Sequence, residues 1–180
     1  MHRIYTGKTY LISILYLLLA FCQTIFATER HILELKQEKD KYNATPYFQY
    51  LEDKKHSIKR EDILNGNLDK EFLPYENKNI NFGFSRSTFW FRLKLKYISR
   101  SEAVLLEIPW PHLDYIDVYI SGKEQILAYK SGRLMPYKDR IYPHKNFIFE
   151  IPYDPDELVI YIKVRSDETL IFPIHIFDKS

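Results

Sequence analysis

The segment STFWFRLKLKY, residues 87–97, alternates between two kinds of side chain with a period of two. One side is wholly apolar and consists of Phe89, Phe91, Leu93 and Leu95. The other side mixes an aromatic ring with cations, in the order Trp90, Arg92 and Lys94. Because successive side chains of a strand point to opposite faces, the segment predicts a strand with a core face and a chemically different second face.

The same period recurs along the rest of the chain, in short runs separated by turn residues. The runs are residues 103–110, 114–120, 146–151, 158–166 and 171–177. Gly, Pro and Asp stand between runs, in the segments SGKE, SGR and YDPDE, where tight reversals need them. Helix signals are slight: SIKREDILNG predicts one short helix, with Ser57 as an N-cap and Gly66 as a stop, and HILELKQEKDKY, residues 31–42, is compatible with another that would bury little. The pattern predicts an all-β sandwich of antiparallel sheets.

The N-terminus carries an export signal. A basic flank with Arg3 and Lys8 precedes the apolar run LISILYLLLAF, and the small residue Ala27 ends the segment. This order is typical of a secretory signal peptide cleaved after Ala27. An uncleaved signal anchor is the alternative, because residues 10–27 approach the roughly 20 apolar residues of a membrane span. Cys22 invites a third interpretation, a lipoprotein, but the bulky Phe21 before it is unfavourable for lipidation.

Cysteine usage and charge narrow the class of the exported part. Cys22 is the only cysteine of the chain, so a chain cut after Ala27 has no disulfide and no cysteine metal cage. Without Arg3 and Lys8 the basic residues fall from 26 to 24, equal to the 24 acidic ones. Since no net positive field remains, we expect no nucleic-acid partner. We assign residues 1–27 to the signal or anchor, 28–44 to a charged tether and 45–180 to one sandwich domain.

The second face of three strands offers binding chemistry. If the strands neighbour each other in one sheet, aromatic rings lie among charged groups, which suits a polar ring such as a sugar. The candidate ligand-binding residues on these strands are Trp90, Arg92, Tyr115, Tyr119, Tyr161 and Arg165, with Asp117 and Lys163 between them.

A structural interpretation of the same residues stands beside the binding one. Tyr and Trp favour strands, and cross-strand pairs of aromatic or charged residues stabilise a sheet without any ligand. In this interpretation Trp90 is buried under a loop with its N–H bonded to a carbonyl, and Arg92 is an ion-pair partner. The sequence leaves both interpretations open.

Catalytic and metal signatures are missing from the sequence. There is no Gly-rich phosphate loop, no G-x-S-x-G elbow and no histidine pair at metal-ligand spacing. We therefore expect no enzyme, no cofactor and no metal site. A glycoside hydrolase is the remaining enzymatic alternative, because two carboxylates far apart in sequence can meet in space.

The order of these segments resembles a known family, the type 2 extracellular domain of seven-transmembrane receptors with diverse intracellular signalling modules. The similarity lies in the W-x-R strand at Trp90 and Arg92, the E-I-P step before DYIDVY, the Arg140 segment and the late RS…L…PI ending. The segment YLEDKKHSIKREDI, residues 50–63, is also similar to the family's entry segment. The resemblance covers residues 45–178.

The resemblance implies a jelly-roll-like β-sandwich similar to carbohydrate-binding modules, placed outside the cytoplasmic membrane. It implies a sensor for a small-molecule ligand, with carbohydrate as the first class to consider, joined to a membrane-embedded receptor portion or partner. It carries the family's recurrent positions onto Trp90, Arg92, Tyr119 and Arg140. We expect a periplasmic or extracytoplasmic location and keep a protein–protein interaction domain, for example a homodimer, as the alternative function.

Overall fold

The computed structural model describes residues 32–37, 40–75, 77, 79–99, 101–123 and 125–179, together with Ser13 and Ile14. The predicted export segment, residues 1–27, lies outside the described residues apart from the helical Ser13 and Ile14. No described helix has the length and apolarity that a membrane span requires. The compact unit Ile32–Ser180 contains all the strands described below.

The larger sheet follows the order β4-β3-β6-β11-β8-β9, and β1 pairs with β6 as well. Every pairing is antiparallel except that of β1 with β6, which is parallel. Its strands are β1 (Ile32–Leu35), β3 (Gln49–Asp53), β4 (Leu73–Pro74), β6 (Thr88–Tyr97), β8 (Tyr115–Ser121), β9 (Ile126–Ser131) and β11 (Leu158–Arg165).

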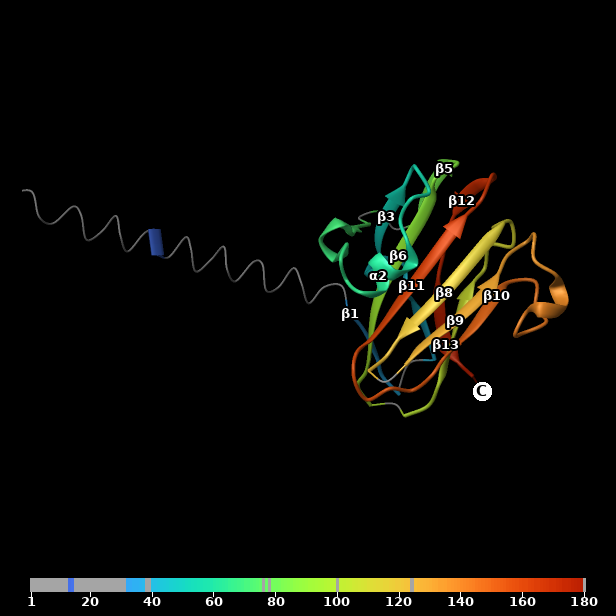
Figure 1. Cartoon of the computed structure of the whole chain (residues 1–180). Helices are drawn as coiled ribbons and strands as arrows, with labels where there is room; N and C mark the ends of the chain where they lie inside the picture. Colours follow the sequence, from blue (N-terminus) through green and yellow to red (C-terminus); the bar gives the residue numbers. More distant parts are fainter. Residues whose placement is uncertain are drawn as a thin grey trace, which may run out of the picture. The chain divides into compact units, whose positions relative to one another are not determined.

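The second sheet has the order β10-β7-β13-β2, and its pairings are all antiparallel. Its strands are β2 (Lys41–Asn43), β7 (Val104–Ile108), β10 (Phe147–Ile151) and β13 (His175–Asp178). A short antiparallel pair joins β5 (Asn81–Phe84) to β12 (Thr169–Ile171). From β6 to β13 the chain repeatedly crosses between the two sheets, so the expected jelly-roll-like β-sandwich is confirmed (Figure 1).

The core lies between the two sheets and is built by the period-two faces. The predicted inward residues of β6, β7, β8, β10 and β11 are buried there, for example Phe91 of β6 and Ile162 of β11. Aromatic rings fill the centre: the ring of Phe91 stacks on Phe172 at 4.2 Å, and Phe48 meets both rings edge-on at 6.3 Å. The alternation therefore predicts the core correctly.

The predicted tether, residues 28–44, is wrong for two of its segments. β1 adds Leu33 and Leu35 to the core, and β2 pairs with the last strand, β13. The sequence pattern did not indicate these two strands, because their apolar residues lie among charged residues. The charged side chains point outward from the edges of the sheets. The sandwich of the structure thus begins before residue 45.

Short helices lie in the connections between strands: η1 (Thr45–Tyr47), α2 (Arg60–Leu64), η2 (Asp69–Glu71) and η3 (Tyr137–Asp139). The expected helix is present as α2, and Gly66 follows it with a left-handed φ of 74°. The predicted N-cap is wrong, because Lys59 takes that position without a side-chain cap. The backbone N–H of Ser57 instead donates to the Asp53 carboxylate at 3.0 Å.

Candidate functional site

The three strands that carry the predicted binding residues are neighbours. β11 pairs with β6 on one side and β8 on the other, so their second faces form one surface. One row across the ladder reads Gln49–Arg92–Tyr161–Tyr119–Ala128. The next row reads Leu51–Trp90–Lys163–Asp117–Lys130. The expectation that these side chains share a face is confirmed.

A segment between β3 and β4, residues 54–72, covers part of this face. We call it the covering segment; it contains α2 and η2. Its apolar residues Ile63 and Phe72 form a second buried cluster with three residues of the sheet, Trp90, Tyr119 and Tyr161. Burial raises the pKa of Tyr161, and the nearby Asp69 carboxylate raises it further. These predicted ligand contacts are therefore packed against the protein itself.

Trp90 occupies the centre of the second cluster and is 0% exposed. Its ring stacks on Tyr119 with centroids 6.1 Å apart, and the Lys163 ammonium lies 5.2 Å above it. The Nε1–H group has no hydrogen-bond partner among the described residues, so the bond to a carbonyl that the sequence suggested is not found. Burial under a loop, the structural interpretation, describes Trp90 in this structure.

Arg92 fastens the covering segment to the sheet and is only 6% exposed. Its guanidinium donates to the Asp69 carboxylate at 2.7 Å and to the Asp69 carbonyl at 3.2 Å. Two further N–H groups donate to Gln49 Oε1, at 2.9 and 2.7 Å. The guanidinium also lies 4.4 Å from the Phe72 ring centroid. Arg92 therefore contacts both the polar groups of Asp69 and Gln49 and the apolar second cluster.

Replacement of Arg92 should destabilise the covering segment more than the rest of the domain. We expect Arg92→Ala to lower the free energy of unfolding by about 1.5–3 kcal/mol, the usual range for hydrogen bonds to a charged group. Amide hydrogen exchange in residues 54–72 should accelerate more than exchange in β7 and β10. Arg92→Lys is the matched control and should recover little, because an ammonium cannot copy the two-sided fork. Uniform acceleration across both sheets would contradict this local role.

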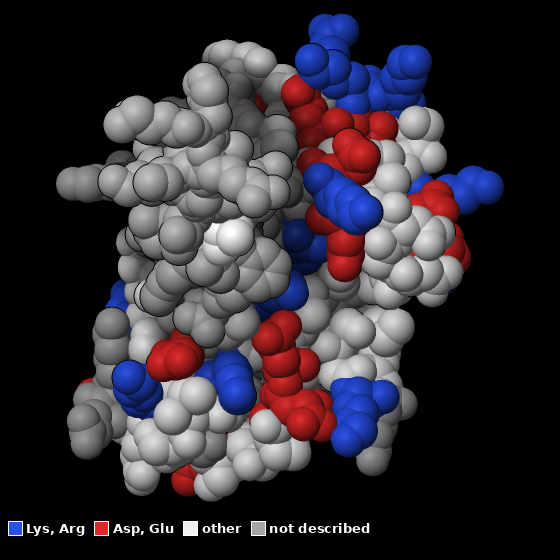
Figure 2. Space-filling model, turned by 90° about the vertical axis from the view of Figure 1, so that its left-hand side faces the viewer, with Lys and Arg blue, Asp and Glu red and all other residues white. Residues whose placement is uncertain are grey.

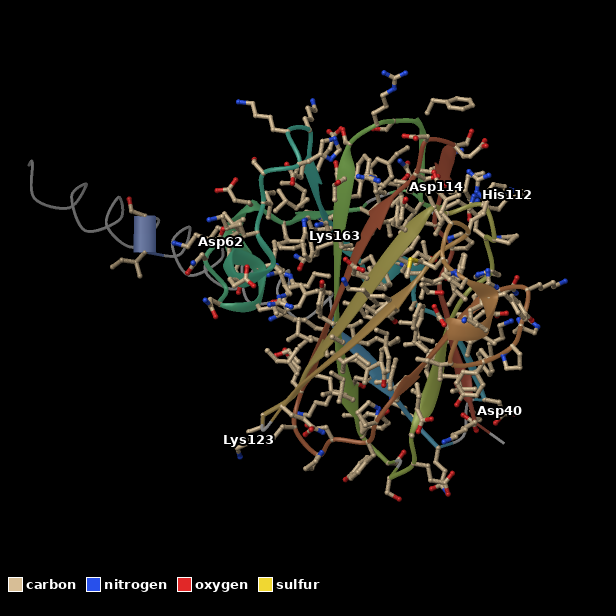
Figure 3. The ribbon with its side chains drawn as sticks, turned by 45° about the vertical axis from the view of Figure 1, so that its right-hand side comes forward. Asp40, Asp62, His112, Asp114, Lys123 and Lys163 are labelled. Carbon is tan, nitrogen blue, oxygen red and sulfur yellow. The ribbon has the colours of Figure 1, made fainter. Side chains whose placement is uncertain are left out.

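Beside the second cluster, the same face opens into a cleft of about 510 Å³. Figure 3 labels Lys163 in the middle of the larger sheet and Asp114 just before the start of β8. The described lining comes from β6, β8, β9, β11 and two loops, and consists of His56, Thr88, Tyr115, Asp117, Lys130, Ser131, Met135, Lys163 and Arg165. A cavity of this size suits a small ligand.

Two predicted residues, Tyr115 and Arg165, line this cleft together. They are paired across β8 and β11, and the Arg165 guanidinium lies 4.6 Å from the Tyr115 ring centroid. Tyr115 is 38% exposed, so its ring is accessible. The structure thus divides the predicted set: one aromatic–arginine pair faces the cleft, and the other, around Trp90, is covered.

Arg140 lies away from this group, in the loop that contains η3. Its guanidinium donates to the carbonyl of His144 at 2.7 Å and lies over the Phe147 ring at 4.7 Å. It is absent from the described lining of the cleft. A ligand contact at Arg140 stays a prediction, separate from the cleft.

Sequence reasoning missed five lining residues: His56, Thr88, Lys130, Ser131 and Met135. His56 comes from a turn, at a left-handed φ of 53°, and its Nδ1 lies 2.8 Å from Thr88 Oγ1. The buried Asp53 carboxylate holds the turn by accepting the N–H groups of Ser57 and Ile58. The position of Lys130 could have been predicted, since it alternates with apolar residues on β9, the strand that follows β8. The turn gave no such signal.

Asp114 precedes the cleft-lining Tyr115 and is 3% exposed. Its carboxylate accepts from Arg133 Nε at 2.9 Å and from the Asp167 backbone N–H at 2.8 Å. Burial opposes ionisation, but these donors outweigh it and hold the pKa of Asp114 below its usual 3.8. The ionised carboxylate thereby ties together the chain segments before β8, after β9 and after β11.

Acid should weaken this tie. A folded-state pKa below the unfolded value of 3.8 stabilises the protein above that pH, and the stability is lost as the pH falls through the folded pKa. We expect the free energy of unfolding, measured by urea titration, to be level from pH 7 to about pH 5 and to fall as the pH drops below that. Asp114→Asn should lower it at pH 7 and flatten this dependence. A slope that is unchanged in Asp114→Asn would assign the acid sensitivity to other carboxylates.

Comparison with known proteins gives a family match and matches to solved structures. No curated protein matches the chain. One of the solved structures, titled "Structural basis for the promiscuous specificity of the carbohydrate-binding modules from the beta-sandwich super family", is 12% identical, with a TM-score of 0.28. The match covers 77% of this chain and 55% of that chain.

The family model described as 7TMR-DISM extracellular 2 matches residues 45–178. These residues include both sheets of the sandwich except for β1 and β2, and all the lining of the cleft. The chain therefore belongs to the 7TMR-DISM extracellular 2 family, an extracellular domain of seven-transmembrane receptors.

Proposed function

We propose that this chain is the extracytoplasmic ligand-sensing domain of a bacterial signalling receptor, and that the cleft at Tyr115 and Arg165 is its binding site. The ligand is a small molecule with a polar ring, and carbohydrate is the first class to test. Its signal passes to a membrane-embedded receptor portion. Family membership supports the receptor setting, and the periplasmic side is the location that this setting requires.

One observation carries the proposal: the accessible Tyr115 ring lies beside charged side chains in a cleft of about 510 Å³. An aromatic face stacks on the apolar side of a sugar ring, and charged donors bond its hydroxyls. The covering segment buries Trp90 and Tyr161 but contributes only His56 to the described lining of this cleft. The binding site we propose is thus narrower than the whole second face.

Binding without catalysis fits the lining of the cleft. Among its described residues only Asp117 carries a carboxylate, whereas a glycoside hydrolase ordinarily uses two. Histidine, cysteine and acidic residues of the described part form no cluster that would hold a metal ion. Lys and Arg are interspersed with Asp and Glu on the described part of the face in Figure 2, an arrangement unlike a nucleic-acid stripe.

A glycan array followed by thermal shift tests the proposal. A ligand at a hundredfold excess over its Kd should stabilise the protein by about 2.7 kcal/mol. Tyr115→Ala should abolish this shift while the unliganded melting temperature stays close to that of the wild type. Tyr153→Ala, which removes another exposed tyrosine outside the cleft, should leave the shift unchanged.

Two outcomes would count against the proposed site, and a third against the absence of catalysis. A ligand shift that survives Tyr115→Ala would place binding elsewhere on the domain. No hit on the array, together with a mass that rises with concentration in light scattering, would favour the interaction-domain alternative. Turnover of chromogenic glycosides that is lost in Asp117→Asn would favour the hydrolase.

A further inference from the structure

We infer that the cleft binds an anionic ligand, whose carboxylate or phosphate group lies between Lys163 and Arg165. The inference rests on the proposed function, because it specifies the chemistry of the ligand for the same cleft. A purely neutral sugar would leave the main electrostatic feature of this site unused.

The charges of the cleft are unbalanced. Three cations, Lys130, Lys163 and Arg165, line it against the single carboxylate of Asp117. Asp117 is opposite both lysines in the ladder. Within the described part of the chain, however, none of the three cations has an ion-pair partner within 4.0 Å. Other cations of the same face are paired, as Arg92 is with Asp69.

Aromatic rings hold two of these cations in place. Lys163 lies 5.2 Å from the centroid of the buried Trp90 ring, and the Arg165 guanidinium lies 4.6 Å from that of Tyr115. A cation over a ring face keeps its N–H donors free at the edge, because the ring accepts no conventional hydrogen bond from them. The guanidinium fork matches a carboxylate or phosphate in a two-bond geometry. Both donors are therefore positioned before a ligand arrives.

Another part of the lining, His56 and Thr88, is also held in a fixed geometry. His56 has a φ of 53°, which residues with a side chain rarely adopt, and its Nδ1 lies 2.8 Å from the hydroxyl of Thr88. The Asp53 carboxylate, 4% exposed, fixes this turn through two backbone N–H groups. Backbone strain of this kind is characteristic of functional sites. The imidazole and hydroxyl add polar groups to the same lining as the cations.

Three probes that share one sugar ring test the inference: glucose, glucuronate and glucose 6-phosphate. Calorimetric titration of the purified chain should give a Kd at least tenfold lower for an acidic probe than for glucose. The affinity should fall as NaCl rises, because salt screens the cations. The better of the two acidic probes identifies the anion as carboxylate or phosphate.

Variants then locate the anion. Arg165→Gln and Lys163→Gln should each weaken the acidic probe at least tenfold and weaken glucose by a much smaller factor, because the glutamine amide still donates to a hydroxyl but carries no charge. Lys41→Gln, which removes an exposed lysine of the other sheet, should change neither. Circular dichroism confirms that each variant is folded.

The failures of the two proposals differ. If glucose and the acidic probes bind equally and all lose affinity in Tyr115→Ala, the cleft is the ligand site but the anion inference is wrong. If no acidic probe binds, or if acidic probes bind equally well to Arg165→Gln and Lys163→Gln, the inference is wrong as well. If, in addition, Tyr115→Ala does not change the affinity for any probe, the proposed binding site is wrong too.

Discussion

Trp90→Ala should destabilise the domain by about 3–5 kcal/mol, the range for removal of a large buried aromatic side chain. The indole is fully buried and belongs to the second cluster, so its loss leaves a void between the sheet and the covering segment. For a domain of this size the melting temperature should fall by on the order of 10 °C. Differential scanning calorimetry measures it directly.

Trp90→Phe is the control for this substitution. It keeps a ring in the cluster and removes the Nε1–H group that lacks a partner among the described residues, so it should cost clearly less than Trp90→Ala. A melting temperature of Trp90→Ala within about 2 °C of the wild type would mean that the covering segment collapses onto the sheet without cost. That result would reopen a direct ligand role for Trp90.

Gly132→Ala should destabilise the domain by more than about 2 kcal/mol, because backbone conformation and space both exclude a side chain there. Gly132 follows β9 with a φ of 141°. A Cβ atom would overlap the carbonyl oxygen of Asp114 and lie 2.9 Å from Cα of Tyr115. Chemical denaturation monitored by circular dichroism gives the free energy of unfolding.

Gly83→Ala separates these two causes. Gly83 also has a positive φ, 64°, but a Cβ there would meet nothing within 4 Å. It should therefore cost only the left-handed penalty, about 1–2 kcal/mol. If Gly132→Ala is no more costly than Gly83→Ala, the close approach between the chain after β9 and the start of β8 can relax. In that case Tyr115, whose backbone lies next to Gly132, should also tolerate the small backbone movement.

The alternation of the long strands predicted the core because burial in a sandwich has the same period as the strand itself. Phe91 shows this best, since it lies in the core between the two sheets, as its place in the alternation requires. β1 and β2 escaped prediction because short edge strands contribute few apolar residues each. Pairing with distant partners, β6 and β13, decides their structure, and a local pattern contains no information on that.

The candidate site was predicted in part. The rows of the sheet brought Tyr115, Asp117, Lys163 and Arg165 to one face, as the alternation required. The sequence left open whether a loop would bury Trp90 and did not indicate which segment would do so, because the contact between Phe72 and the sheet depends on the path of the chain between β3 and β4. It did not place His56 either, since a turn residue has no period to follow.

The contact between Lys163 and Trp90 gives the cleft an optical consequence. The ammonium lies over the indole ring, and Trp90 is one of two tryptophans in the chain. An anion that draws the ammonium toward itself would change the electric field at the indole and shift its emission. The hidden tryptophan would thereby act as a built-in fluorophore for events in the cleft, although the ligand never touches it.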